Sequence, residues 1–191
     1  MARRLVVLSD LWGSKKGLWI TSYLGYLQQY YDIVYYDSRQ MAAMDLPPVH
    51  TLEELYHTFA ESGMKRAAAQ LLSREKEPCH YLAFGGGGSI AWQAALMGLP
   101  MKSLYAVSPL CLQKIGDHHP DCPVTLVYGE YHENRPAPHW FREVGLEPEV
   151  IERFGQELYS DEKIIQKVCM DLLDGVLKGR DGKPRKQLSA Y

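Results

Sequence analysis

Four consecutive glycines, residues 85–88, constrain this chain more than any other feature of its sequence. They follow an apolar segment, residues 79–84, and precede a segment whose apolar residues have helical spacing. Glycine is needed where the backbone takes a positive φ, or where a helix and a strand approach too closely for a side chain. The pattern therefore predicts a buried strand, a tight turn and then a helix, which we expect over residues 89–97.

Short apolar runs alternate with helical patterns along the rest of the chain. The expected strands are residues 5–8, 33–36, 79–84, 103–107, 124–128 and 149–154. The other expected helices are residues 19–30, residues 51–74, which Gly63 weakens or splits, and a last helix that begins at Ser160. This alternation predicts an α/β fold, a three-layer sandwich around a mostly parallel sheet of about six strands.

Length and charge bound the organisation and the partners. The 191 residues fit one domain, which we expect over residues 1–178. Residues 179–191 are basic and poor in aliphatic side chains, and we expect them to form a mobile tail. A net charge of −2 argues against a nucleic-acid binder, because such a protein needs a basic face.

The first apolar run and the cysteines indicate where the protein works. Residues 5–8 form a run too short for a signal peptide, and no stretch is long enough to span a membrane. The four cysteines include no C-x-x-C pair, which favours reduced thiols over disulfides. These observations predict a cytoplasmic protein with no membrane partner.

Three kinds of site use a glycine-rich turn after a strand. A Walker A phosphate loop needs a Lys followed by Ser or Thr at the start of the helix, and Ser89 and Ile90 supply no Lys. A dinucleotide-binding turn needs a glycine at the position of Ile90 and normally follows the first strand. The third kind is the nucleophile elbow, in which two small residues flank a nucleophile on a strained strand-to-helix turn.

Residues 81–95 resemble the nucleophile elbow and following helix of the α/β-hydrolases. In that pattern Ala83 and Gly87 take the two small positions. The nucleophile position then falls on Gly85, which has no side chain that could attack a substrate.

The resemblance continues downstream, in the family's order of catalytic residues. Residues 124–132 resemble the strand and turn that carry the triad acid, and His132 takes that position. Residues 154–160 resemble the turn that carries the triad histidine, and Gln156 takes that position. The resemblance covers most of residues 4–178, but the family's first antiparallel strands and a lid before residue 124 are missing or short.

A Ser-His-Asp triad works because the histidine takes the hydroxyl proton while the acid orients the imidazole. With Gly85, His132 and Gln156 at the three positions, the resemblance implies a hydrolase fold without triad hydrolysis. It also implies oxyanion donors in the backbone N–H of Gly86 and one near Leu11 or Trp12, and these do not depend on the triad.

We therefore expect a binding or regulatory module with a small acyl or carboxylate ligand over Gly85. The expected binding residues are Ser9, Asp10, Leu11, Trp12, Gly86 and Ser108. The alternative is a small esterase or thioesterase with a relocated nucleophile or a water activated by His132. The partner is then a small molecule, and a homo-oligomer stays open.

Other chemistry-bearing residues have simpler interpretations. We expect Ser89 to cap its helix and Cys111 to be a buried, unreactive thiol. Residues 117–122 contain adjacent histidines, but their spacing does not suit one metal ion, so a solvated loop is expected. The sequence predicts no metal and no cofactor.

Overall fold

The computed structural model describes residues 3–12, 18–47 and 49–177. The strands are β1 (Arg3–Leu8), β2 (Tyr31–Tyr36), β3 (Cys79–Phe84), β4 (Met101–Val107), β5 (Val124–Gly129) and β6 (Glu149–Ile151). The α-helices are α1 (Trp19–Leu27), α2 (Ser38–Ala42), α3 (Leu52–Thr58), α4 (Met64–Arg74), α5 (Gly86–Leu96), α6 (Pro138–Val144) and α7 (Glu162–Leu177). Shorter turns are the π-helical η2 (Phe59–Gly63) and the 3-10 segments η3 (Leu112–Lys114) and η4 (Leu158–Ser160).

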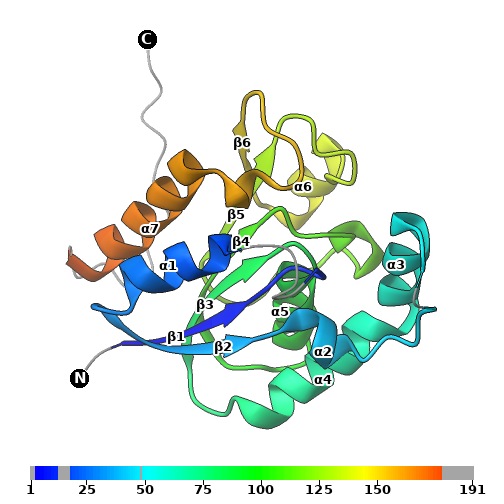
Figure 1. The fold of residues 1–191 in the computed structure, drawn as a ribbon, viewed down its shortest axis with the longest axis horizontal. Helices are drawn as coiled ribbons and strands as arrows, with labels where there is room; N and C mark the ends of the chain where they lie inside the picture. The colour runs from blue at the N-terminus through cyan, green and yellow to red at the C-terminus, as the bar shows by residue number, and fades with distance from the viewer. Residues whose placement is uncertain (1–2, 13–17, 48, 178–191) are drawn as a thin grey trace.

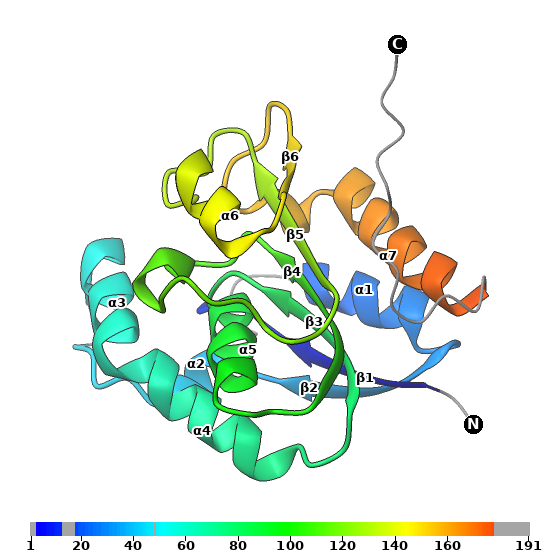
Figure 2. The same ribbon diagram turned by 180° about the vertical axis from the view of Figure 1, so that it is seen from behind.

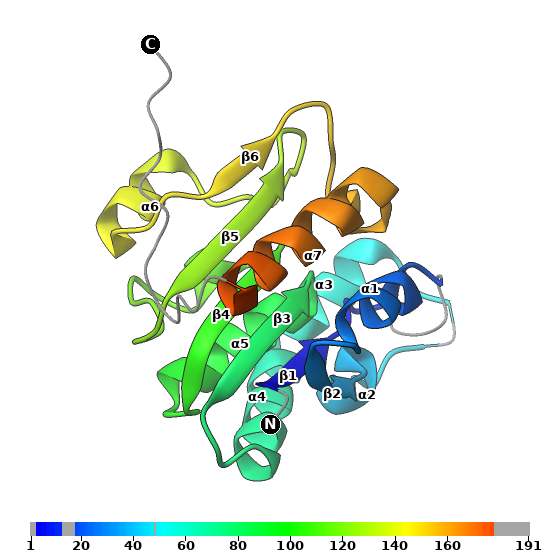
Figure 3. The ribbon, with the colours of Figure 1, turned by 90° about the vertical axis from the view of Figure 1, so that its left-hand side faces the viewer.

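The strands form one sheet in the order β2-β1-β3-β4-β5-β6, and every described pair is parallel (Figure 3). Leu8, at the end of β1, lies opposite Tyr36 of β2 and Ala83 of β3. The chain leaves β1 towards one edge of the sheet to form β2 and returns across it to form β3. The loops after β1 and β3 therefore part at this point, which is where open α/β sheets place their ligands.

Helices cover both faces of the sheet, which makes three layers (Figures 1 and 2). Leu5 and Val7 of β1 pack in a core with α1 and α7. Val6 and Leu8 point the other way, into a larger core with helices α2 to α6. This alternation along one strand is the two-residue period of a sheet buried on both faces.

The expected α/β class and the six-strand sheet are confirmed. Within the described residues no antiparallel strand joins the sheet, and the connection from β4 to β5 holds only the short segment η3, as the resemblance implied. The expected weak point at Gly63 is present as the π-helical segment η2 between α3 and α4.

Several expected boundaries are wrong. Helix α1 ends at Leu27 and not at residue 30, and α7 begins at Glu162 and not at Ser160. Helix α5 begins at Gly86 and not at Ser89, so three of the four glycines are helical. Because glycine has a low helix propensity, the sequence pattern places these three residues in the turn and not in the helix. Strand β6 ends at Ile151 and not at residue 154, because the chain turns at Arg153, which has a φ of 66°.

Helices α2 and α6 have no counterpart among the expected elements, because each is too short to give a periodic apolar pattern. Both have recognisable ends. Asp37 caps α2, and its side chain accepts a hydrogen bond from the N–H of Gln40. Pro138 opens α6 and Gly145, with a φ of 70°, closes it.

The expected tail, residues 179–191, lies outside the described residues. In the part of the chain that the structure describes, no helix combines the length and apolarity needed to cross a membrane.

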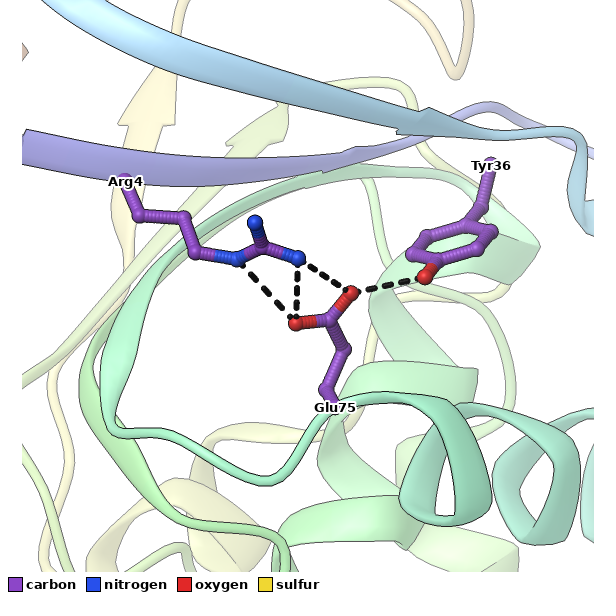
Figure 4. A network of polar contacts seen from close by, with 3 residues as sticks. All are labelled: Arg4, Tyr36 and Glu75. Carbon is purple, nitrogen blue, oxygen red and sulfur yellow. Dashed lines mark hydrogen bonds and ion pairs between the residues drawn. The ribbon is translucent and has the colours of Figure 1, made fainter.

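An ion pair between a buried carboxylate and a partly exposed arginine joins the end of α4 to the sheet (Figure 4). Glu75 is 2% exposed and accepts hydrogen bonds from the guanidinium of Arg4 on β1, the shortest at 3.0 Å. The hydroxyl of Tyr36 on β2 donates to the same carboxylate at 2.7 Å. The Arg74 guanidinium lies 5.7 Å from the centre of the Tyr36 ring. One carboxylate thus joins a helix end to two neighbouring strands.

We predict that Glu75→Gln lowers the free energy of unfolding by about 1–3 kcal/mol, because the hydrogen bonds that Arg4 and Tyr36 donate at this buried position lose a charged acceptor. Urea denaturation measures the change. Glu77→Gln, at an exposed position two residues away, is the matched control and stays within about 0.5 kcal/mol of the natural protein. Equal stability of the two variants would show that the network does not stabilise the fold.

Candidate functional site

The turn between β3 and α5 has the backbone of a strained strand-to-helix elbow. Gly85 has a φ of 51° and a ψ of −123°, a backbone conformation that residues with a side chain rarely adopt. Its N–H donates to the carbonyl of Val107 on β4 at 2.9 Å, and its own carbonyl accepts from the N–H of Gly88 at 3.0 Å. The elbow is therefore fixed to the neighbouring strand and to the first turn of its own helix.

The next three glycines bring α5 against neighbouring segments. A Cβ added at Gly87 would lie 2.3 Å from the carbonyl oxygen of Ser9, and one at Gly86 would lie 2.5 Å from the side chain of Leu11. At Gly88 a Cβ would meet Pro109 at 2.8 Å. At Gly87 and Gly88 the close atoms belong to backbone and to a proline ring that cannot move aside, so packing against the loops after β1 and β4 requires glycine at these two positions.

Asp10 and Tyr159 occupy the space next to Gly85. A Cβ added at Gly85 would lie 3.1 Å from the Cβ of Asp10 and 3.9 Å from the hydroxyl of Tyr159. Tyr159 donates to Asp10 Oδ2 at 2.9 Å, and the backbone N–H of Trp12 donates to Asp10 Oδ1 at 3.1 Å. Burial and the neighbouring Asp10 raise the pKa of Tyr159 well above its usual value, which keeps its hydroxyl a donor. Both side chains are almost fully buried, so a carboxylate of the protein itself lies beside the elbow.

Ser9 is held by the loop after β2 and not by the elbow. Its hydroxyl accepts from the N–H of Ser38 at 3.0 Å and donates to the carbonyl of Asp10 at 3.0 Å. The Ser38 hydroxyl in turn donates to the carbonyl of Ser9 at 2.5 Å. With both of its hydrogen-bonding roles used, Ser9 joins two loops and is not presented as a nucleophile.

Gln156, at the position of the triad histidine, reaches towards α3. Its amide donates to the hydroxyl of Tyr56 at 2.5 Å, across 100 residues of sequence. Burial raises the pKa of the Tyr56 hydroxyl above its usual value. Asp10 and Cys111 lie near enough to raise it further. The last loop and α3 therefore meet beside the elbow through a neutral hydrogen bond.

His132, at the position of the triad acid, is turned into the protein. It is 4% exposed, and its ring meets the ring of Tyr128 edge to face at 5.1 Å between centres. Burial lowers the pKa of His132 to about 4, and the nearby carbonyl of Ser108 offsets part of that effect. Its imidazole is therefore neutral at pH 7.

The remaining candidates are buried as well. Ser108 is fully buried at a φ of 51°, directly after β4. Cys111 is 8% exposed, and burial raises the pKa of its thiol, so its thiolate is scarce at neutral pH. The expected cap role of Ser89 is wrong, because Ser89 lies inside α5 and its hydroxyl joins the carbonyl and the N–H of Leu110.

The structure thus brings some of the expected residues together and separates others. Asp10 and Leu11 lie against the glycine turn, and the N–H of Trp12 donates to Asp10, whereas Gln156 and His132 have partners of their own. Sequence reasoning missed Tyr159 and Tyr56. Tyr159 lies three residues after Gln156, in the segment that resembles the turn of the triad histidine, and this nearness in the sequence was the one signal that it could lie at the elbow. The sequence carries no local signal for the contact of Tyr56 with Gln156.

Comparisons with known proteins support this architecture. No family model and no curated protein matches the sequence. Solved structures do match. A candidate hydrolase of the alpha/beta superfamily from Xanthomonas campestris has a TM-score of 0.60 at 16% identity, over 93% of this chain and 99% of that one. A predicted CIB-like hydrolase from Thermoplasma acidophilum has a TM-score of 0.62 at 16% identity, over 92% and 87% of the two chains.

This chain has the α/β-hydrolase fold. A further match, described as an α/β serine hydrolase without a lid, also from Xanthomonas campestris, has a TM-score of 0.55 at 12% identity, over 96% of this chain and 86% of that one. In the α/β-hydrolase fold the elbow follows the strand that corresponds to β3, and here Gly85 lies there with the strained backbone intact.

Two surface hollows lie away from the elbow. One, of about 290 Å³, is bordered by the end of α5 and residues 120–122. The other, of about 380 Å³, lies between β2, α2 and α4. Neither is lined by an expected site residue. Across residues 3–12, 18–47 and 49–177, no three His, Cys, Asp or Glu side chains gather in a way that could hold a metal ion.

We predict that Gly87→Ala destabilises the protein by about 3 kcal/mol or more, because the added methyl group meets backbone and not a flexible side chain. Urea denaturation measures the effect. Gly175→Ala is the control: its position in α7 has no atom within 4 Å of an added Cβ, and the change is neutral or stabilising by up to about 1 kcal/mol. If Gly87→Ala behaved like its control, close packing would not explain the glycine turn.

Proposed function

We propose that this protein is an α/β-hydrolase-fold module that binds a small ligand beside the elbow and does not hydrolyse it through a triad. The observation that carries the loss of triad hydrolysis is the elbow itself, where Gly85 offers no side chain. The Cβ of Asp10 lies 3.1 Å from the place of a Cβ at Gly85, and Tyr159 and the N–H of Trp12 hold its carboxylate.

The positions of the other two triad residues support the same proposal. A catalytic base must reach the nucleophile's proton, and a catalytic acid must hold the base. Gln156 has an amide that cannot act as a base at neutral pH, and it is bonded to Tyr56. His132 packs against Tyr128, and burial disfavours its charged form.

No observation favours a relocated nucleophile. The hydroxyl of Ser9 is used between two loops, and the thiol of Cys111 has a raised pKa. His132 is almost fully buried, which leaves its imidazole little access to a substrate or its water. None of these groups is therefore placed to hydrolyse a ligand at the elbow in the proposed function.

The groups around the elbow indicate which charge the ligand carries. The first N–H groups of a helix such as α5 attract an oxygen atom with a partial or full negative charge. The Asp10 carboxylate next to Gly85 opposes a second carboxylate at the same place. Of the two ligand types expected from the sequence, we therefore propose the neutral acyl group, held through its carbonyl oxygen by the N–H of Gly86.

We also propose a cytoplasmic location. All four cysteines are free thiols, which suits a reducing compartment.

We predict no turnover above the uncatalysed rate with short p-nitrophenyl esters and thioesters, because no activated nucleophile faces the elbow. The rate of product release measures this, with a triad esterase as the positive control. Ser9→Ala, Cys111→Ala and His132→Ala leave the background unchanged. Turnover that any of these three variants abolished would contradict the proposal.

The same experiment includes a ligand arm. Butyramide, a neutral acyl compound that is not cleaved, raises the melting temperature of the natural protein, whereas butyrate does not. Gly85→Ala removes the effect of butyramide, because the new methyl group enters the space beside Asp10. Equal effects of butyramide on both proteins would place its binding away from the elbow.

A further inference from the structure

Strand β2 forms one edge of the sheet, and no described strand pairs with its outer side (Figure 3). The strand is 6 residues long and pairs with β1 without a shift of register. Proteins protect such edges with Pro, Lys, bulges or very short strands, because the N–H and C=O groups of an edge can pair with another chain. Residues 31–36 contain neither Pro nor Lys, and their one charged residue is Asp32. The outer side of β2 is therefore able to pair with a further strand.

The hydrogen bonds to β1 decide which residues of β2 face outward. The carbonyl of Tyr36 accepts from the N–H of Ser9, directly after β1, at 3.1 Å. In a parallel pair both polar backbone groups of a residue point to the same neighbouring strand, and those of the next residue point the other way. Tyr36 and Val34 therefore face β1. The N–H and C=O groups of Ile33 and Tyr35 face the outer side.

A second copy of β2 fits this edge in antiparallel register when Val34 lies opposite its own counterpart. Ile33 then lies opposite the partner's Tyr35, so two residues that face outward meet and exchange their N–H···O=C bonds. A two-fold axis through the Val34 pair repeats this contact on its other side. The register also places an aromatic ring beside a β-branched side chain, which is a favourable cross-strand pair.

The charges at the two ends of β2 are complementary in this register. Asp32, Val34 and Tyr36 share the sheet face covered by α4, and Asp32 lies opposite the partner's Tyr36. The guanidinium of Arg74 lies 5.7 Å from the centre of the Tyr36 ring. Asp32 and Arg74 are both exposed, and neither forms an ion pair with a described residue. A carboxylate of each copy therefore meets a guanidinium of the other, twice by symmetry.

The structure has room for this contact. The surface hollow of about 380 Å³ lies between β2, α2 and α4, and its lining includes Gln40 and Arg74. Asp37 also lines the hollow, and its carboxylate accepts from the N–H of Gln40 at 3.0 Å. The hollow lies at the carboxyl end of β2, which is where the partner's Asp32 comes in the antiparallel register.

We propose that two copies of this chain associate through their β2 edges into a two-fold dimer with one continuous sheet. A second copy, and not an unrelated protein, is the occupant because the edge is self-complementary in both its backbone groups and its charges. One added strand pair buries a small interface, so the dimer is weak and its population depends on protein concentration. The dimer is independent of the ligand proposed at the elbow.

Sedimentation velocity of the full chain, from about 1 to about 200 μM, measures the dimer dissociation constant. Arg74→Glu sets like charges against each other and raises this constant about 10-fold, and Asp32→Arg does the same. The double variant restores opposite charges and returns the constant to within about 3-fold of the natural value. Asp117→Arg, at an exposed position between β4 and β5, is the matched control and has no effect. A natural protein that stays monomeric throughout, or a dimer that none of the variants changes, would overturn the proposal.

A disulfide tests the register without changing any charge near Arg74. The Val34 pair exchanges no backbone hydrogen bonds, so its side chains lie close, with Cα atoms about 4.5 Å apart. Mild oxidation of Val34→Cys therefore gives a covalent dimer. Asp32→Cys gives none, because the two thiols lie on strands offset by about 14 Å. The natural protein, with its four free thiols, sets the background. No covalent dimer from Val34→Cys, or one from Asp32→Cys alone, would contradict the register.

Discussion

The close approach of helix α5 to the end of strand β1 is the constraint on which the rest of this structure depends. At Gly87 there is no space for a side chain, because the carbonyl of Ser9 lies where a Cβ would be. Gly85 adds a backbone conformation that L-residues rarely adopt. Once these contacts are made, the loops after β1, β3 and β4 have one arrangement, and the elbow follows from packing whether or not it carries a nucleophile.

The same constraint explains why an elbow without a nucleophile is still well formed. In a serine hydrolase the strained turn presents a side chain to substrate. Here the turn presents no side chain, and Asp10 lies beside it, held by hydrogen bonds from Tyr159 and from the N–H of Trp12. The strained backbone of the elbow is present, while Gln156 joins the last loop to α3 and His132 packs against Tyr128 of β5.

Much of the fold could be predicted from the sequence, because buried strands and amphipathic helices leave periodic patterns. The glycine run correctly marked the elbow. The glycine run gave a wrong start for α5, because glycine has a low helix propensity whereas tertiary packing makes Gly86, Gly87 and Gly88 helical. The site was harder. The bond between Gln156 and Tyr56 joins residues 100 positions apart, and the burial of His132 depends on how a turn folds back, so neither leaves a local pattern.

The central claim is that no side chain at the elbow is an activated nucleophile, and covalent labelling tests it most directly. A fluorophosphonate reacts with serines that a neighbouring base activates, and the labelled residue is identified by mass spectrometry of the intact protein and its peptides. The account predicts that the folded natural protein stays unlabelled under conditions that fully label a triad esterase. Stoichiometric labelling of Ser9, Ser89 or Ser108 that is lost on unfolding would contradict it.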